Sequence, residues 1–329
     1  MTTRASRTTT MTDVARRAGT STAVVSYVMN DGPRPVAAAT RDRVLAAAAE
    51  LNYRPNRIAR ALRARRTGVV GLILADASNP YFAALAREIE RALADHDTLT
   101  LVGNADHSAT RQKHLAERFL AAQVDGLVVV SADGGADVAA EAEASGTPAV
   151  YVHHRPRTAR GPLVPADNDA VHAAVAHLRD HGYARVDFLS GPTDAGPVGR
   201  RRRAWTHATA GTGAALLRCG FSRAAAAALT VRLAAADAVP SALVVATDEQ
   251  AIGVLAGACR AGIAVPDRLA LVSLDGAPGS AYTAPALTVT RQPLPAMAER
   301  AVDLLLTGAS ADPDPLSAPL VPRGTCGCP

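Results

Sequence analysis

The sequence predicts a chain of two parts, a small all-α unit followed by a larger α/β unit of two lobes. Residues 10–54 place apolar side chains at helical spacing, with no alternating pattern. From residue 67 onward, short runs of Val, Leu and Ile alternate with Ala-rich helical stretches, and this rhythm occurs twice. The charge divides at the same point, because residues 1–66 carry a net +9 and the remainder a net −4.

The basic first part indicates contact with a polyanion, although an Arg-rich solvated surface would give the same count. The first ten residues are polar, with no apolar leader segment, and no run of the 329 residues is long enough to span a membrane. We therefore expect a disordered tail over residues 1–9, no membrane partner and a cytoplasmic, nucleoid-associated protein.

Residues 10–54 predict a helix-turn-helix DNA-binding domain. Thr10 and Asp13 have the spacing of a capping box, Gly19 ends the first helix, and Ser21 can cap a second. A third helix should bury Val44, Leu45, Ala48 and Leu51. In a helix-turn-helix the second helix enters the major groove, where it would present Thr22, Ala23, Ser26 and Tyr27. A generic three-helix bundle would show the same spacing.

Residues 55–66 predict a conditional hinge helix and linker. Pro55 can begin a short helix whose only apolar face is formed by Ile58, Ala59 and Leu62. A helix this short is marginal alone in water. It should therefore order only against a partner, such as its twin from another subunit or DNA.

These residues resemble the LacI/GalR family of bacterial transcription regulators. The matching stretches are Thr12-Asp13-Val14-Ala15-x-x-Ala18-Gly19-x-Ser21, Val25-Ser26-x-Val28-x-Asn30, and Leu51-x-Tyr53-Arg54-Pro55-Asn56-x-Ile58-Ala59-x-x-Leu62. The resemblance implies a dimer whose hinge helices insert Leu62 into the minor groove as an apolar wedge. It also implies that six further residues contact DNA, namely Thr12, Asn30, Asn56, Arg57, Ala59 and Leu62.

Two residues of this part depart from the family pattern. Tyr27 stands where the family most often has Arg, so the preferred operator sequence should differ from the usual one. Ala37 stands where a helix-capping Ser is common, and the loss of such a cap typically costs about 1 kcal/mol.

Strands are predicted by the apolar runs of the second part, and helices by the stretches between them. The expected strands are 69–74, 99–104, 126–130, 149–152, 186–190, 243–246 and 270–274, and the first three helices are 81–95, 109–122 and 136–145. Ligands of parallel sheets bind beyond the carboxyl ends of the strands. A ligand site is therefore expected between the two lobes.

The second part, residues 67–329, extends the family resemblance. Ser78-Asn79-Pro80-Tyr81-Phe82, Val124-Asp125-Gly126-Leu127, Asp167-Asn168 and Thr290-Arg291-Gln292-Pro293 look like family motifs. They imply a two-lobed, periplasmic-binding-protein-like regulatory core that binds a small effector and forms a dimer or a tetramer. The positions matching effector contacts are Tyr81, Phe82, His153, His154, Arg201, Phe221, Asp248 and Asp275. The two histidines stand where an Asp is common.

We expect no metal site, no cofactor and no catalytic residues. Cys326-Gly327-Cys328 is half of a metal-binding pattern, and a disordered tail explains it more simply. His177 and His181 lie four residues apart on a predicted helix, but no third ligand is evident, so an exposed helix face is the simpler interpretation. The sequence contains neither a phosphate-binding loop nor a Gly-x-Ser-x-Gly elbow.

The function expected from this sequence is a transcription repressor that binds double-stranded operator DNA under the control of a sugar-like effector. An activator or a corepressor-dependent regulator is the alternative. A solute-binding protein is a remote alternative, because it would have no use for a helix-turn-helix.

Overall fold

The computed structural model describes residues 9–29, 34–54, 66–130, 136–157, 159–194 and 196–328. The chain divides into two compact units, Met1–Thr67 and Gly68–Pro329. Residues 1–8 of the tail expected over residues 1–9, Asn30 and the expected hinge helix, with Asn56, Arg57, Ala59 and Leu62, lie outside the described residues. Thr9 is described and is not disordered, since its hydroxyl donates to the carbonyl of Leu51 at 3.1 Å. In the part that is described, no helix is long and apolar enough to cross a membrane.

The first unit, here called the head, contains α1 (Met11–Ala18), α2 (Thr22–Met29) and α3 (Ala38–Glu50). The predicted capping box forms, since the side chains of Thr10 and Asp13 each accept from the other's backbone N–H. Gly19 ends α1 in the left-handed region at φ 64°, and the Ser21 hydroxyl accepts from the N–H of Val24 at the start of α2. Val14, Val25 and Val44 meet in the core.

One predicted core position of the head is wrong. Leu45 is 46% exposed, whereas Ala47 is 4% exposed and takes part in the core. The buried face of α3 follows residues 44, 47, 48 and 51, and residue 45 is one helical step, about 100°, from residue 44. Ala37 occupies the N-cap of α3 and makes no side-chain capping bond, as expected.

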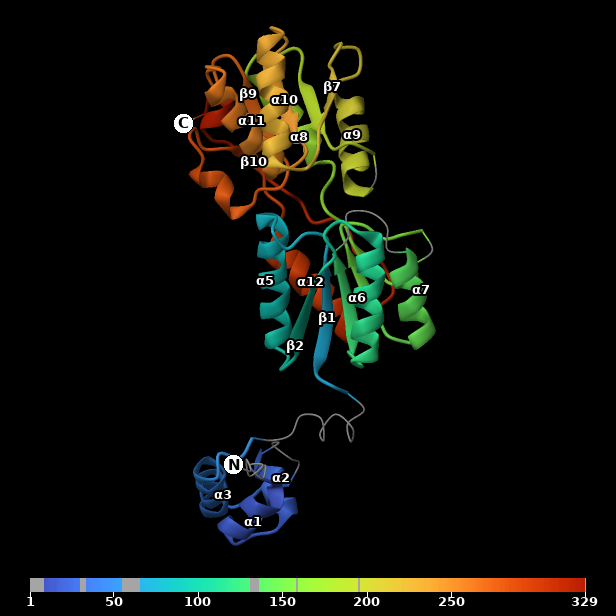
Figure 1. The fold of residues 1–329 in the computed structure, drawn as a ribbon, viewed down its shortest axis with the longest axis vertical. Coiled ribbons are helices and arrows are strands. Elements are labelled where there is room, and N and C mark those ends of the chain that lie inside the picture. Colours follow the sequence, from blue (N-terminus) through green and yellow to red (C-terminus); the bar gives the residue numbers. More distant parts are fainter. Residues whose placement is uncertain are drawn as a thin grey trace, which may run out of the picture. The chain divides into compact units, whose positions relative to one another are not determined.

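Lobe 1 of the second unit is a parallel five-stranded sheet in the order β2-β1-β3-β4-β5. Figure 1 labels its strands β1 and β2 together with the helices around them. Its strands are β1 (Val69–Leu74), β2 (Leu99–Asn104), β3 (Gly126–Val130), β4 (Ala149–Val152) and β5 (Leu163–Val164). Its helices are α5 (Pro80–Ala94), α6 (Ala109–Ala121), α7 (Ala136–Ser145) and α12 (Leu294–Thr307). Successive strand residues face opposite sides, so Leu72 packs under α5 and α12 whereas Ile73 packs under α6 and α7.

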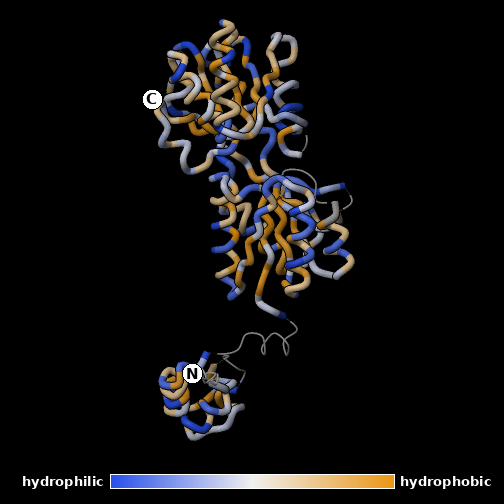
Figure 2. Tube along the Cα trace, in the orientation of Figure 1, coloured by the Kyte–Doolittle hydropathy of each residue, from blue (hydrophilic) through white to orange (hydrophobic). Residues whose placement is uncertain are grey.

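Lobe 2 has a six-stranded sheet in the order β11-β10-β9-β8-β6-β7, in which only β11 is antiparallel to its neighbour. Its strands are β6 (Asp187–Ser190), β7 (Leu216–Arg218), β8 (Ala242–Val245), β9 (Ala270–Ser273), β10 (Thr288–Thr290) and β11 (Leu320–Val321). Its helices are α8 (Ala170–Asp180), α9 (Gly196–Ala208), α10 (Arg223–Ala235) and α11 (Asp248–Arg260), with two 3-10 turns, η1 (Pro278–Tyr282) and η2 (Gly324–Cys326). Figure 2 shows the apolar residues gathered along the strands of both lobes.

The chain passes between the lobes three times, after β5, after β10 and after α12. Asp167, in the first passage, forms hydrogen bonds to a residue in each of the other two passages. Its backbone N–H donates to the side chain of Gln292 at 3.1 Å, and its carboxylate accepts from the N–H of Ala318 at 2.9 Å. Gln292 also donates back to the carbonyl of Asp167 at 3.1 Å. The three passages are therefore joined side by side by hydrogen bonds.

Candidate functional site

The lobe 1 side of the site is built at the start of α5 and the end of β4. Asn79 caps α5 by accepting from the N–H of Tyr81, and Pro80 begins the helix, which buries the Tyr81 side chain. The Tyr81 hydroxyl lies 3.1 Å from Nε2 of His153, the first residue after β4. Phe82 stands edge-on to both rings, at centroid distances of 5.5 Å from Tyr81 and 6.2 Å from His153.

The protonation of this pair follows from its burial. Burial, followed by the charges of Arg201 and Arg200, lowers the pKa of His153 to about 3. Burial, followed by the charge of Asp275, raises the pKa of Tyr81 well above its ordinary value. At neutral pH the imidazole is therefore neutral and the phenol protonated, so the two groups share one hydrogen bond whose donor is set by the tautomer of His153.

The lobe 2 side is built around Arg201 on α9. Arg201 lies one helical turn before Trp205, so both side chains face the lobe interior, and Arg201 is only 4% exposed. Its Nη1 donates to Asp275 Oδ1 at 2.9 Å and to the carbonyl of Ala246. Its buried Nε has no hydrogen-bond partner among the described residues. A buried guanidinium N–H without a partner is costly, and it leaves one donor for a bound molecule.

Asp248 and Asp275 follow the carboxyl ends of β8 and β9. The Asp248 carboxylate accepts from the Ser273 hydroxyl at 2.6 Å and from the N–H of Ala277 at 2.6 Å, while Asp275 accepts from the N–H of Asp248 at 3.2 Å. Burial, followed by the charge of Asp275, raises the pKa of Asp248 to about 7. These bonds to the protein give both aspartates a structural role in addition to any contact with a ligand.

The two sides are joined directly. Arg200, on α9 of lobe 2, donates to the carbonyl of His153 in lobe 1. Sequence reasoning gave Arg200 no role. It is one of four consecutive arginines, and the sequence alone does not show which way each side chain leaves the helix. The charge of Arg201 also acts on both His153 and Tyr81 across the lobes. We call Tyr81, Phe82, His153, Arg200, Arg201, Asp248 and Asp275 the inter-lobe cluster.

Phe221 and His154 lie outside these contacts. Phe221, on the loop between β7 and α10, is 38% exposed and covers Gly191 at the end of β6, where an added Cβ would lie 2.0 Å from the ring. His154 is half-buried and follows His153 in the chain.

Gln250 was not predicted as a site residue, but it is fully buried and donates to the carbonyl of Ser190, which holds the end of β6. The Ser190 hydroxyl is buried without a partner in the described part of the chain.

In the head, Thr12, Thr22 and Ala23 are exposed, and Ser26 and Tyr27 are partly exposed. Four of these residues lie on α2, whose opposite face carries the buried Val25 and Val28. The expected DNA-reading side chains on α2 are therefore accessible.

The structure corrects the sequence interpretation of the cysteines and of two histidines. Cys326 is 2% exposed in the core of lobe 2 and does not lie in a disordered tail. His177 and His181 do not form an isolated exposed pair, because Cys326 and Cys328 supply the further ligand atoms that seemed absent. The expectation of no metal site rested on the lack of further ligand atoms, and that reason does not hold.

Comparison with known proteins gives the same two parts. Residues 10–56 match the family of bacterial regulatory proteins called the lacI family. Residues 70–184 match a periplasmic binding protein domain, and residues 175–326 match a periplasmic binding protein-like domain. The transcriptional regulator MalR of Streptomyces coelicolor is 34% identical over 94% of this chain and 93% of its own length. Catabolite control protein A of Priestia megaterium is 32% identical over 87% of this chain and 88% of its own.

Solved structures show the same architecture. The Lac repressor dimer bound to operator and the anti-inducer ONPF has a TM-score of 0.85 at 25% identity, over 97% of this chain and 99% of that one. The regulator CelR in complex with cellobiose has a TM-score of 0.71 at 24% identity, over 96% and 99% of the two chains. A helix-turn-helix head and a two-lobed binding core define a transcription regulator. The chain belongs to the LacI family of these bacterial regulators.

Proposed function

We propose that this protein is a dimeric repressor whose affinity for operator DNA is controlled by a small, sugar-like molecule bound at the inter-lobe cluster. The observation that carries the effector site is the buried Arg201, whose Nε has no partner among the described residues. Around it stand a phenol, a neutral imidazole and two carboxyl groups, drawn from both lobes. Donors and acceptors of this kind suit the hydroxyl groups of a polar metabolite.

The proposed control of DNA binding is linkage. The inter-lobe cluster includes groups from both lobes, so an effector bound there can favour one arrangement of the lobes over another. It then shifts the population toward that arrangement, by no more than its own difference in affinity for the two. The hinge expected over residues 55–66 would order only when the dimer holds its two copies together.

A surface for self-association is offered by the edge of lobe 1. The edge strand β2 exposes Leu99 to 52%, Leu101 to 39% and Val102 to 52%. Apolar side chains on an exposed sheet edge promote association with another chain. The Lac repressor structure cited above is a dimer on its operator. We assign β2 to the interface between two copies of this chain.

The effector site is tested by a thermal-shift screen of the full-length protein with sugars and nucleosides. Any molecule that raises the melting temperature is then titrated into the protein–operator complex. Phe221, an expected effector contact beyond the inter-lobe cluster, keeps a half-exposed ring at the end of β6 that can pack on a bound molecule, so Phe221→Ala should weaken binding of that molecule about tenfold. Val231→Ala on α10, where the side chain is similarly exposed at 39%, is the matched control.

Equal affinity of Phe221→Ala and the control for the molecule would reject the ring as part of the site. Release of DNA by the molecule supports a repressor. Tighter DNA binding supports the corepressor-dependent alternative.

The DNA-reading role of α2 is tested by selection of operator sequences from a random library. Tyr27→Arg should change the preferred bases, because Arg pairs with guanine through two hydrogen bonds and Tyr cannot. Ala46→Arg adds the same charge at an exposed position of α3 and should leave the preferred sequence unchanged. An unchanged preference in Tyr27→Arg would remove this residue from the reading surface.

A further inference from the structure

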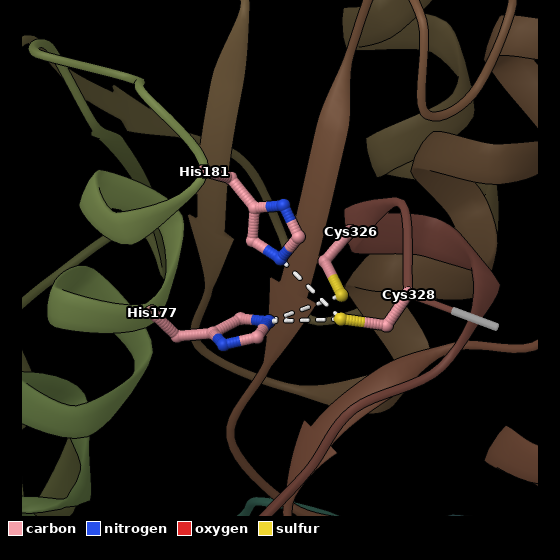
Figure 3. Close-up of side chains that lie close together, drawn as sticks. All are labelled: His177, His181, Cys326 and Cys328. Atoms are coloured by element: carbon pink, nitrogen blue, oxygen red, sulfur yellow. Dashed lines mark hydrogen bonds between the residues drawn. The ribbon is translucent and has the colours of Figure 1, made fainter.

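The end of α8 and the last turn of the described chain bring four metal-ligand side chains together (Figure 3). His177 and His181 lie four residues apart, so their rings leave the helix on one face, with His181 just beyond its last turn. Cys326 and Cys328 come from the other side, one within η2 and one just after it. In Figure 3 both imidazoles point toward both sulfur atoms.

The distances between these atoms suit a single small ion. Nε2 of His177 lies 3.1 Å from Cys326 Sγ and 3.8 Å from Cys328 Sγ, and Nε2 of His181 lies 3.3 Å from Cys328 Sγ. All four ligand atoms lie within 4.8 Å of one another. Tetrahedral zinc, with Zn–S of about 2.3 Å and Zn–N of about 2.0–2.1 Å, separates a sulfur from a nitrogen by roughly 3.6 Å.

The two thiols are held in place by the backbone around them. Thr325 is fully buried, donates to the carbonyl of Leu271 at 2.8 Å and accepts from the N–H of Thr288 at 2.8 Å. Gly327 adopts φ 94°, which favours glycine and lets the chain turn back between the two cysteines. The turn that presents both sulfur atoms is therefore anchored to the sheet.

Cys326 also receives a hydrogen bond suited to a metal-bound thiolate. The Thr288 hydroxyl lies 3.1 Å from Cys326 Sγ and 2.9 Å from the carbonyl of Arg323, so these two acceptors share its single hydrogen. Such outer-shell donors orient the ligand and stabilise its negative charge. A disordered pair of cysteines would have neither the burial of Cys326 nor this donor.

We propose that His177, His181, Cys326 and Cys328 bind one zinc ion, which fastens the last residues of the chain to α8. Two thiolates and two imidazoles form a ligand set typical of structural zinc, and they balance its charge. Soft sulfur ligands disfavour magnesium and calcium, which take oxygen ligands. The alternatives are a disulfide between Cys326 and Cys328, or thiols and imidazoles that pack together without a metal.

Cobalt substitution of the full-length protein tests the site. The protein is purified under reducing conditions without a histidine tag, stripped of metal with a chelator, and titrated with Co²⁺. One equivalent should produce the intense visible bands of tetrahedral cobalt together with a thiolate-to-cobalt charge-transfer band, and added Zn²⁺ should remove both. Elemental analysis after zinc loading should give one zinc per chain.

Substitution of single ligands locates the site. Cys328→Ser and His181→Ala change side chains that are half-buried and exposed, so both variants should fold. Each should weaken Co²⁺ binding on the order of 100-fold or more, because even outer-shell substitutions weaken metal binding 10–100-fold. Cys259→Ser and His172→Gln are the matched controls, since Cys259 is an exposed thiol elsewhere and His172 an exposed imidazole on α8. Both controls should bind cobalt as the unsubstituted protein does.

Three results would overturn the proposal. The first is the absence of tetrahedral cobalt bands in the reduced protein. The second is full cobalt binding by Cys328→Ser and His181→Ala. The third is a Cys326–Cys328 disulfide whose reduction yields no metal uptake. None of these results bears on the inter-lobe effector site, whose residues are separate from these four.

Discussion

Removal of Asp275 should destabilise lobe 2 strongly, because it leaves a buried charge without its partner. The side chains of Arg201 and Asp275 are 5% and 7% exposed, and their charged atoms lie 2.9 Å apart. Breaking such a pair from one side typically costs about 3–5 kcal/mol, whereas an exposed pair is worth about 0–1 kcal/mol. Asp275→Ala also takes an acceptor from the N–H of Asp248. We therefore expect a loss of about 3–5 kcal/mol in the free energy of unfolding.

The chain contains its own reporter for this measurement. Trp205 is the only tryptophan, it is buried in the core of lobe 2, and it stacks on Phe188 at a centroid distance of 5.5 Å. Urea unfolding followed by Trp205 fluorescence therefore reports on this lobe. Arg223→Ala, which breaks an exposed pair with Glu249, is the control and should cost less than about 1 kcal/mol.

A double variant separates the charge from the packing. Arg201→Met with Asp275→Leu replaces the pair by apolar side chains of similar size, and such exchanges of buried pairs are often neutral or stabilising. It should recover most of the stability lost in Asp275→Ala and still fail to respond to the effector, because the free Nε donor is gone. A cost for Asp275→Ala no larger than that of the Arg223→Ala control would refute the buried-pair reasoning.

Two further predictions concern the head and pH. Ala37→Ser supplies the missing N-cap of α3 and should raise the stability of the head by about 1 kcal/mol, as followed by thermal circular dichroism of the head; no gain would mean that the backbone at Ala37 does not admit the cap. Because the pKa of His153 falls from 6.5 unfolded to about 3 folded, the unfolded state binds the extra proton, and stability is lost as pH drops below about 6.5. From pH 7 to 5 His153 removes about 2 kcal/mol, while Asp248, whose pKa rises from 3.8 to about 7, adds a similar amount. Over this range the unsubstituted protein should therefore lose about 2 kcal/mol more stability than His153→Gln, and equal pH profiles of the two proteins would contradict the reasoning.

Much of the fold could be predicted because long apolar runs and capping residues are local signals. The strands β1, β2, β3 and β4 have the predicted bounds, β6 and β9 differ by one residue at one end, and β8 is shifted by one residue at both ends. The short strands β5, β7 and β10, of two or three residues, were not predicted, because so few residues carry no pattern that distinguishes a strand from a loop.

The sites were less predictable, because they depend on residues far apart in the sequence. Arg201 was expected in the site because it matches a position of the family, but nothing local shows that Arg200 reaches His153, 47 residues away. The same holds for His177 and Cys326, which lie 149 residues apart in sequence and 3.1 Å apart in space. The histidine pair and the cysteine pair are each weak evidence for a metal site. They become a set of four ligands only because the fold places η2 beside α8.

The three hydrogen-bonded passages between the lobes have a consequence for how a signal travels. Three is an odd number, so the polypeptide that enters lobe 1 at Val69 reaches its last described residues in lobe 2. The head is thus covalently attached to lobe 1, whereas the proposed zinc ion would stabilise lobe 2. A rotation of the lobes must bend all three passages at once, because Asp167 ties them together. Fluorescent labels placed near Gly68 in lobe 1 and at the exposed Cys259 in lobe 2 would then measure that rotation.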